Sequence, residues 1–428
     1  MGSHASWRPQ SFSFISHCTV MLTGTNLKSA KALNHRIVME TVRLHAPISR
    51  AEIARQTSLT PQTISNIVGE LIEADLIREA GKRQQGRGAP SITLGINAEG
   101  AYSVGLDLDR DHLTGVLIDL SGTVRQRTHH QLSFPTPEEA VALMAESVHD
   151  LVDQEDLSLD KVSGAGIGLP GPIEVLSEDR EIATVNPEAF PGWDHSPIVD
   201  MLETRVDLPI FLKNNATAAA VGERWYGIGK EVSTFFYLLF GIGLGGGVVI
   251  DGHPYEGHSG NAGELGYVPT LNDETEQHGF NGTQPTHLGE HYHLPRLYEQ
   301  LQQNSVNADS PEDLAAPFAE ESPLINDWLD TVVDQLAPLL VSVEYLIDPA
   351  VIVFGGRLPS SLLEALISRL DHRRSEMRTR PKGFVPALRQ ASVGTDAAAK
   401  GVATLPIYNL FAPSPYLVSE EQRSQVHT

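Results

Sequence analysis

The chain has 428 residues, of which 41% are hydrophobic, so it is long enough for two or three domains with sizeable cores. Its apolar runs are interrupted by glycine or charge well short of about 20 residues, which excludes a membrane-spanning segment. Cys18 is the only cysteine, so a disulfide framework and a cysteine-based metal site are excluded, and a reducing cytoplasm is the expected location.

The net charge of −23 is unevenly distributed along the chain. Residues 1–100 contain 11 lysines and arginines and 7 acidic residues, whereas the remainder contains 20 and 47. A mildly basic N-terminal part on a strongly acidic body is typical of a DNA-binding head attached to a body that does not bind DNA.

Residues 1–22 are predicted to be a disordered tail or tag, because Gly2-Ser3-His4 resembles an expression scar and the segment lacks the pattern of a signal peptide. A helix is expected from Leu27 to His45, where apolar residues recur at helical spacing. The residues expected on its buried face are Leu33, Ile37, Val38, Val42 and Leu44.

Residues 47–80 predict two short helices joined by a tight turn and followed by a strand. Ser49 and Glu52 have the spacing of a capping box, and Thr60 before Pro61 predicts the start of the second helix. One apolar stripe is expected on that helix, formed by Ile64, Ile67, Val68, Leu71 and Ile72. A helix-turn-helix protein presents the outer face of this helix to base edges, and the residues there are Gln62, Thr63, Ser65 and Asn66. The alternative is an ordinary helical hairpin.

Two strands around a basic, glycine-rich loop at residues 81–88 predict a wing after the helices. Residues 23–97 are therefore predicted to form a winged helix-turn-helix DNA-binding domain. Lys82, Arg83 and Arg87 are expected to contact phosphates, or in the case of Arg87 a narrow minor groove. A flexible basic linker is the alternative interpretation of this loop.

Residues 98–411 have the alternating pattern of an α/β body, and residues 412–428 are expected to be a tail. Strands are predicted at 102–109, 112–120, 123–132, 162–169, 210–213, 235–240, 247–250 and 351–354. Helices are predicted at 137–154, 198–205, 216–225, 325–347 and 397–405. We expect two lobes, roughly 98–220 and 221–390, with the C-terminal helix returning to the first.

Several segments, taken in order, resemble the ROK family of sugar-responsive repressors, open reading frames and sugar kinases. They are the head at 49–78, GIGLPGP at 166–172, NNAT at 214–217, GIGLGGG at 241–247, GNAGELGY at 260–267 and Gly355-Gly356. The ordered set is specific, although each glycine-rich piece alone is weak. The resemblance covers about residues 25–410 and implies an N-terminal winged helix-turn-helix followed by a two-lobed ribonuclease H-like body of the actin/hexokinase type.

Three departures from the family pattern bear on phosphate transfer. The family's first phosphate loop is Asp-x-Gly-Gly-Thr, but here Asp107 is followed by Leu-Asp-Arg-Asp, which adds carboxylates where phosphate would bind. Ile242 replaces a threonine, and Asn215 replaces the catalytic aspartate, so no base is available for a sugar hydroxyl. We therefore expect a protein that is not an enzyme and has lost the ATP site. The alternative is an active ATP-dependent sugar kinase with a regulatory DNA-binding head.

Sugar binding is still expected, because amides can exchange hydrogen bonds with a polyol. By the resemblance, the sugar site comprises Gly171, Asn214, Asn215, Glu264, Tyr267 (where the family has histidine) and Glu290. The family's zinc-binding cysteines are missing, so no zinc is expected. His278, His287, His291 and His293 could form a substitute metal site, but ordinary loop histidines are favoured.

Together these features predict a cytoplasmic transcription regulator, most simply a repressor of carbohydrate uptake or catabolism genes. Its expected partners are double-stranded operator DNA, a sugar or sugar derivative, and further copies of itself in a homodimer or homotetramer, with no membrane partner. A regulator that senses a partner protein instead of a sugar is a further possibility.

Overall fold

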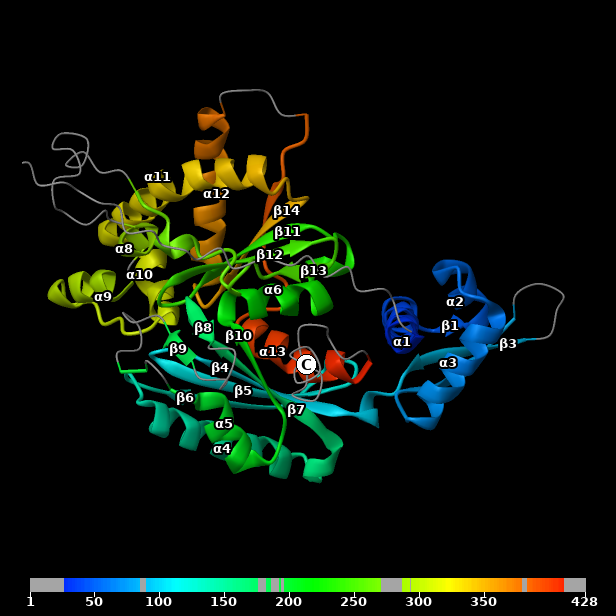
Figure 1. Ribbon diagram of the computed structural model, residues 1–428. Coiled ribbons are helices and arrows are strands. Elements are labelled where there is room, and N and C mark those ends of the chain that lie inside the picture. Colours follow the sequence, from blue (N-terminus) through cyan, green and yellow to red (C-terminus); the bar gives the residue numbers. More distant parts are fainter. Residues whose placement is uncertain are drawn as a thin grey trace, which may run out of the picture.

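The computed structural model describes residues 27–84, 90–175, 182–185, 192–193, 196–270, 287–292, 294–378 and 383–411. The predicted tails and Arg87 lie outside these residues. Figure 1 shows a small N-terminal head (blue) beside a larger body that contains two sheets.

The head forms a winged helix-turn-helix. Its elements in chain order are α1 (Leu27–His45), β1 (Ile48–Ser49), α2 (Arg50–Thr57), α3 (Pro61–Glu73), β2 (Ile77–Arg83) and β3 (Ser91–Ile96). The strands form an antiparallel sheet in the order β1-β3-β2. The pair β2 and β3 is the predicted wing, whereas β1 was not predicted, because two residues are too few to show an alternating pattern.

The local signals at the helix starts are confirmed. The hydroxyl of Ser49 accepts the backbone N–H of Glu52, and the Glu52 carboxylate accepts the N–H of Ser49 at 2.9 Å, which completes the capping box. Thr60 caps α3 and Pro61 is its first residue. The stripe of α3 is buried at Ile64, Ile67, Val68 and Leu71 and half-buried at Ile72.

The buried face of α1 differs from the prediction at both ends. Leu33 is 50% exposed and Leu44 is 40% exposed, so the prediction that they point inward is wrong. Val38 and Val42 are buried as predicted, together with Met39, which had been left out. The reason is that only the middle of α1 packs into the cluster it shares with α2, α3 and the body.

The first lobe is a five-stranded sheet in the order β10-β7-β4-β5-β6. Its strands are β4 (Tyr102–Leu108), β5 (His112–Asp119), β6 (Val124–Gln131), β7 (Val162–Leu169) and β10 (Ile210–Asn214). The helices α4 (Pro137–Gln154) and α5 (Ile198–Val206) cover its outer face. Every strand and both helices fall within one or two residues of their predicted positions.

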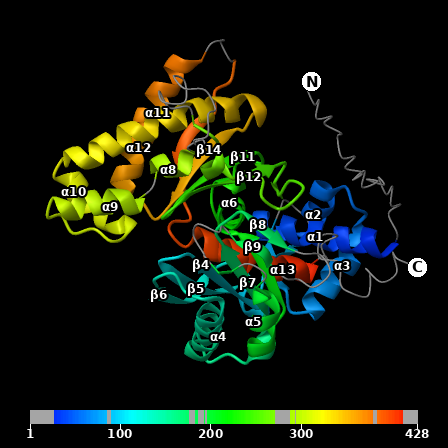
Figure 2. The same ribbon diagram turned by 60° about the vertical axis from the view of Figure 1, so that its left-hand side comes forward.

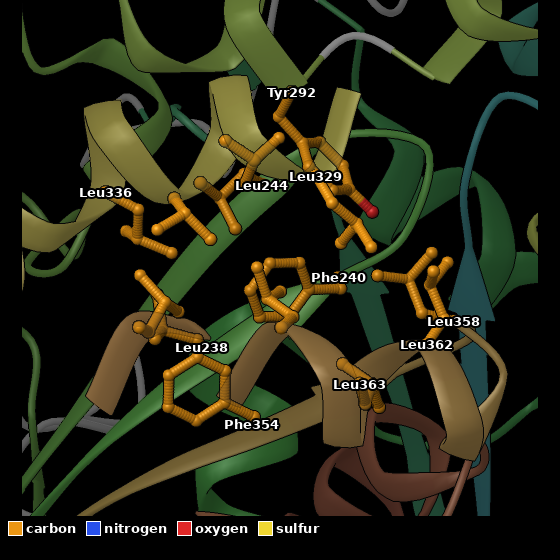
Figure 3. Close-up of a cluster of buried hydrophobic side chains, with 14 of the residues drawn as sticks. Leu238, Phe240, Leu244, Tyr292, Leu329, Leu336, Phe354, Leu358, Leu362 and Leu363 are labelled. Atoms are coloured by element: carbon orange, nitrogen blue, oxygen red, sulfur yellow. The ribbon is translucent and has the colours of Figure 1, made fainter. Parts of the chain in front are cut away.

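The second lobe is a five-stranded sheet in the order β13-β12-β11-β14-β15. Its strands are β11 (Phe235–Phe240), β12 (Leu244–Ile250), β13 (His253–Tyr255), β14 (Val351–Gly356) and β15 (Ala387–Gln390). The helices α11 (Pro323–Leu346) and α12 (Ser360–Met377) pack on one face of this sheet. Figure 3 shows Leu238, Phe240 and Phe354 of the strands against leucines of these two helices.

Two further helices, α6 (Asn215–Tyr226) and α13 (Ala397–Phe411), lie between the sheets. Helix α6 packs on β11 and β12 of the second sheet, whereas α13 packs on β4 and β7 of the first. The body is thus layered as helices, sheet, paired helices, sheet and helices (Figure 2).

The shorter elements of the body are not predicted from the sequence. They are β8 (Ile173–Val175), β9 (Ile182–Val185), β13, β15, α8 (Leu288–Tyr292), α9 (Leu294–Gln303) and α10 (Ala315–Ala319). Helix α12 is not predicted either, although Leu362, Leu366 and Leu370 recur there at helical spacing. Among the described helices, none has the length and apolar character needed to cross a membrane.

The close approach of the α6 and α13 backbones depends on glycine residues in both helices. A Cβ on Gly401 of α13 would overlap the carbonyl oxygen of Ala218 of α6, and a Cβ on Gly222 of α6 would overlap the carbonyl oxygen of Ala397. Glycine at both positions therefore lets the two backbones approach directly, and the helices cannot separate without exposing this buried contact.

We predict that Gly401→Ala lowers the free energy of unfolding by about 1–3 kcal/mol, because the added methyl group forces two packed helices apart. The matched control is Gly69→Ala in α3, where a Cβ would meet nothing within 4 Å. That variant should unfold at the same or a higher urea concentration, since alanine favours helix by up to about 1 kcal/mol over glycine. Equal midpoints for both variants in urea titrations would contradict the close-contact argument.

Candidate functional site

A cavity of about 240 Å³ lies between the two lobes, at the ends of β7, β10 and β11. Five of the six residues assigned to the sugar site line it, namely Gly171, Asn214, Asn215, Glu264 and Tyr267. The side chain of Glu290 lies outside the described residues. The other lining residues include Asp109, Arg110, His287 and the glycine-rich turn at 241–245.

Asn214 joins the two sides of this cavity. Its side-chain oxygen accepts the backbone N–H groups of Ala216 and Thr217 at 2.8 and 3.2 Å, which caps α6. Its side-chain nitrogen donates to Oε1 of Glu264 at 2.5 Å, and Glu264 belongs to the second lobe. The asparagine amide offers an acceptor and a donor at the same time, and both are used here.

Gly171 lies against the same pair. A Cβ at this position would overlap both Oε1 of Glu264 and the side-chain nitrogen of Asn214. Any other residue would displace the hydrogen bond between the lobes or the groups that form it. The glycine is thus required by close approach rather than by an unusual backbone angle.

Glu264 is a carboxyl group of the cavity whose pKa is strongly perturbed. Burial raises the pKa of Glu264 to about 7, although the hydrogen bond from Asn214 acts in the opposite direction. At neutral pH the group therefore exists in both protonation states. A protonated carboxyl donates one hydrogen bond and a carboxylate only accepts, so this side chain can pair with either kind of group on a polyol.

Asn215 and Tyr267 complete the polar lining. Asn215 is 9% exposed, and its side chain makes no hydrogen bond with another described residue, so its amide remains available to a ligand. The ring of Tyr267 lies 5.5 Å from that of His287, centroid to centroid, and Nδ1 of His287 pairs with the carbonyl oxygen of Gly266 at 2.9 Å. One aromatic wall beside several amides and a carboxyl group is suited to a small polyhydroxylated ligand.

The other end of the cavity carries charged side chains from the turn between β4 and β5. Asp109 and Arg110 face the glycine-rich turn, and a Cβ on Gly243 would lie 3.4 Å from the Arg110 guanidinium. Burial raises the pKa of Asp109, while the Arg110 guanidinium acts to lower it. Ile242 is buried in the core of the second lobe. A phosphate placed here would meet the buried Asp109 carboxyl as well as the Arg110 guanidinium.

An ion-pair network crosses between the lobes next to this turn. Arg357, directly after β14, donates to Oδ2 of Asp111 at 2.7 Å and to Glu312 at 2.8 Å. Nδ1 of His112 lies 2.7 Å from Oδ1 of Asp111, and its Nε2 lies 3.8 Å from Asp107. Burial disfavours the charged ring, but these two carboxylates outweigh it and raise the pKa of His112 to about 10. No pattern in the sequence pointed to this network, because its members come from distant segments.

The histidines considered for a metal site do not gather in the described residues. His287 pairs with a backbone carbonyl, and Nε2 of His291 lies 2.9 Å from the hydroxyl of Thr270. Within the part of the chain that the structure describes, no group of three metal-ligating side chains is found. His278 and His293 lie outside that part, so the absence of a metal stays a prediction.

The second candidate surface is the outer face of α3. Gln62, Ser65 and Asn66 are exposed there, and Thr63 is half-buried. The side-chain nitrogen of Gln62 donates to Oδ1 of Asn66 at 2.9 Å, and the hydroxyl groups of Thr60 and Thr63 lie 2.9 Å apart. This pairing holds two amides side by side at the N-terminal end of the helix.

The wing residues have different surroundings. Lys82 is exposed on β2. Arg83 is 44% exposed, but its guanidinium donates to the carbonyl oxygen of Pro47 at 2.7 Å and lies 3.5 Å from Glu52. Arg83 therefore ties the wing to the start of α2, which the sequence did not indicate. Arg87 lies outside the described residues.

Comparison with known proteins places the chain in a family. Residues 103–408 match the model of the ROK family, and residues 33–78 match a model described as winged helix-turn-helix DNA-binding. The first match covers more than half of the chain, so the protein belongs to the ROK family.

Two relatives are named as regulators. A xylose repressor of Bacillus spizizenii is 30% identical over 238 residues, which are 56% of this chain and 60% of the relative. The DNA-binding transcriptional dual regulator NagC of Escherichia coli is 25% identical over 243 residues, which are 57% and 59% of the two chains. The chain thus matches about three fifths of the length of these relatives.

Solved structures share the fold. A ROK family transcriptional regulator described as a homologue of the E. coli MLC protein has a TM-score of 0.71 at 23% identity, over 90% of this chain and 97% of its own. A ROK family glucokinase from Streptomyces griseus, solved with glucose and AMPPNP, has a TM-score of 0.59 at 21% identity, over 71% and 99%. The arrangement of head and body has a counterpart in the regulator, and the body alone has one in the kinase.

We predict that Glu264→Gln changes the pH dependence of stability. Because the folded pKa of Glu264 lies above its ordinary value of 4.5, its favourable contribution is complete below about pH 4.5 and is lost as the pH rises through about 7. Glutamine keeps an oxygen for Asn214 and does not ionise. The thermal midpoint of the variant should therefore exceed that of the wild type by a few degrees at pH 8 and match it near pH 4.5.

The control for this comparison is Glu364→Gln at an exposed position of α12. Its difference from the wild type should stay constant over the same range, measured by differential scanning calorimetry. A constant difference for Glu264→Gln as well would show that Glu264 does not have the raised pKa.

Proposed function

We propose that this protein is a sequence-specific, DNA-binding transcription regulator, a repressor of carbohydrate uptake or catabolism genes. A sugar or sugar derivative in the cavity between the lobes controls its binding to operator DNA. The body has the architecture of a sugar kinase but does not transfer phosphate. One observation carries the proposal. The same chain contains a winged helix-turn-helix, whose α3 has an exposed polar face, and this cavity between the lobes.

DNA binding is supported by the chemistry of the head. Gln62 and Asn66 present adjacent amides, which can form paired hydrogen bonds with adenine in the major groove. Lys82 on the wing supplies positive charge for phosphates. The excess of acidic residues is confined to the rest of the chain, which limits contact of the body with DNA.

Sugar control is supported by the cavity and by the relatives. The cavity offers the polar groups of Asn214, Asn215 and Glu264 beside the ring of Tyr267. Proteins named as a xylose repressor and an N-acetylglucosamine repressor are among the relatives. A sugar can act on operator binding only if it binds the two states of the protein with different affinities. Assembly into a homodimer or homotetramer is part of the proposal, because a palindromic operator needs two heads.

The lack of phosphate transfer is supported by three groups. The amide of Asn215 cannot take a proton from a sugar hydroxyl, since it has no basic form at neutral pH. The buried Asp109 carboxyl lies opposite the glycine-rich turn, and the buried Ile242 offers no hydroxyl to a phosphate. We extend this to cofactors and propose that neither ATP nor zinc is needed.

We predict that Asn66→Ala weakens binding to the specific operator by about 1–3 kcal/mol, roughly tenfold or more, because a base contact is lost. Binding to unrelated DNA should change little, since phosphate contacts supply it. Asn304→Ala, the same change at an exposed position beyond α9, is the control. Gel shifts with the protein's own promoter and with random DNA measure both affinities. An equal loss on both DNAs would remove Asn66 from base recognition.

The complete protein should bind a sugar and show no kinase turnover. Thermal-shift screening against hexoses, pentoses, amino sugars and polyols identifies the ligand, because binding to the native state raises its stability. The best ligand should then alter the gel shift. In a coupled ATP assay with the same panel we expect no turnover. Sustained turnover that disappears in Asn215→Ala would establish a kinase instead.

A further inference from the structure

One helix extends from the cavity to the head. Asn214 caps α6 and Asn215 is its first residue, and both line the cavity. Arg224 and Trp225 lie in its last turn. The helix has 12 residues, so at about 1.5 Å per residue its two ends are about 18 Å apart.

The far end of α6 contacts α1 of the head through charged and aromatic groups. The Arg43 guanidinium donates to the carbonyl oxygen of Trp225 at 2.9 Å and lies 4.4 Å above the Trp225 ring. The Glu40 carboxylate accepts from Arg43 at 2.9 Å and from Arg224 at 3.2 Å. Glu40 therefore holds one arginine from the head and one from α6 in the same cluster.

The charge on Glu40 is stabilised by this arrangement. Burial alone would raise the pKa of Glu40, but its hydrogen bond with Arg43 and the nearby charges of Arg224 and Arg36 lower the pKa overall. The carboxylate is thus ionised at neutral pH. Removing its charge would leave the half-buried guanidinium groups of Arg43 and Arg224 without the carboxylate between them, which costs more than losing an exposed ion pair.

Helix α6 does not move alone, because its neighbours hold it along its length. The buried Glu223 carboxylate accepts the backbone N–H groups of Ser392 and Val393, both at 2.7 Å, just before α13. The hydroxyl of Tyr226 lies 2.9 Å from that of Thr404 in α13. Residues of α13 in turn share a hydrophobic cluster with α1 of the head, so α6, α13 and α1 form one packed unit.

We propose that α6 couples the cavity to the DNA-binding head, and that Glu40 is the positioning residue through which a shift of α6 moves α1. This inference rests on the proposed function, because it concerns the response of operator binding to a sugar. Ligand contacts at Asn214 and Asn215 bias the position of α6 between the lobes. The arginines around Glu40 transmit the shift of α6 to α1 of the head. By thermodynamic linkage, operator DNA changes the sugar affinity of the cavity by the same factor as the sugar changes the operator affinity.

The test is Glu40→Gln in the full-length protein, which keeps the side-chain shape and removes the charge. The operator and the sugar should each bind alone within about threefold of the wild-type affinity. The factor by which saturating sugar changes operator affinity, typically about 5- to 150-fold in coupled systems, should fall to less than about twofold. Glu146→Gln, at an exposed position of α4, is the control and should keep the full factor.

Hydrogen exchange provides a second measurement on the same proteins. Sugar alone should change the protection of the α1 amides in the wild type and in Glu146→Gln, but not in Glu40→Gln. If Glu40→Gln does not fold, Arg43→Lys replaces it, because lysine keeps the charge and loses the paired contacts with Glu40 and Trp225. The same loss of coupling is expected.

Failure of the coupling proposal can be distinguished from failure of the proposed function. If the wild type responds to sugar and the variant tested, Glu40→Gln or its replacement Arg43→Lys, responds to the same extent, the coupling role of α6 is wrong and the proposed function stands. If no sugar in the panel changes operator binding by the wild type, the proposed function is wrong and the coupling proposal falls with it.

Discussion

The hydrogen bond from Asn214 to Glu264 is the contact on which the arrangement of this protein depends. It joins the end of β10 in the first lobe to the second lobe across the cavity, while the same asparagine caps α6. Gly171 is required because any larger residue would occupy the place of this bond. Burial raises the pKa of the Glu264 carboxyl to about 7, whereas the hydrogen bond from Asn214 acts to lower it. The proposed ligand between the lobes would therefore contact the group that connects them.

The paired helices α6 and α13 connect this contact to the rest of the body and to the head. They fill the layer between the sheets, and glycines bring their backbones into direct contact. The hydrophobic core of the head continues into α13 and β5, so the head is not an independently packed domain on a loose linker. A rigid, shared core transmits small displacements, because packed interiors do not deform continuously. This makes a body of kinase architecture suited to controlling a DNA-binding head.

Charge determines what the cavity can do. Asp109 and Arg110 occupy the side near the glycine-rich turn, and Arg357 bridges the lobes beside them through Asp111. Buried charges of this kind are stable only when they are paired, so the network favours one position of the lobes. The amides of Asn214 and Asn215 stay at the opposite side, where they can bind hydroxyl groups without reacting with them. These charges and amides support the proposal that the cavity recognises a polyol and does not transfer phosphate to it.

Local signals in the sequence predict the helix caps of the head, the stripe of α3, most strands of the two sheets and several lining residues of the cavity. These follow from local spacing, or from motifs whose order resembles a family, so they need no knowledge of distant contacts. The exposure of Leu33 and Leu44 follows from the packing of the whole chain. The same is true of the hydrogen bonds from Arg83 to Pro47 and from Arg357 to Asp111. The connection of the cavity to the head by one helix also follows only from the tertiary structure. Each of these features depends on contacts between segments that are far apart in the chain. The spacing of apolar residues and the capping rules describe single elements, so they do not predict which elements pack together.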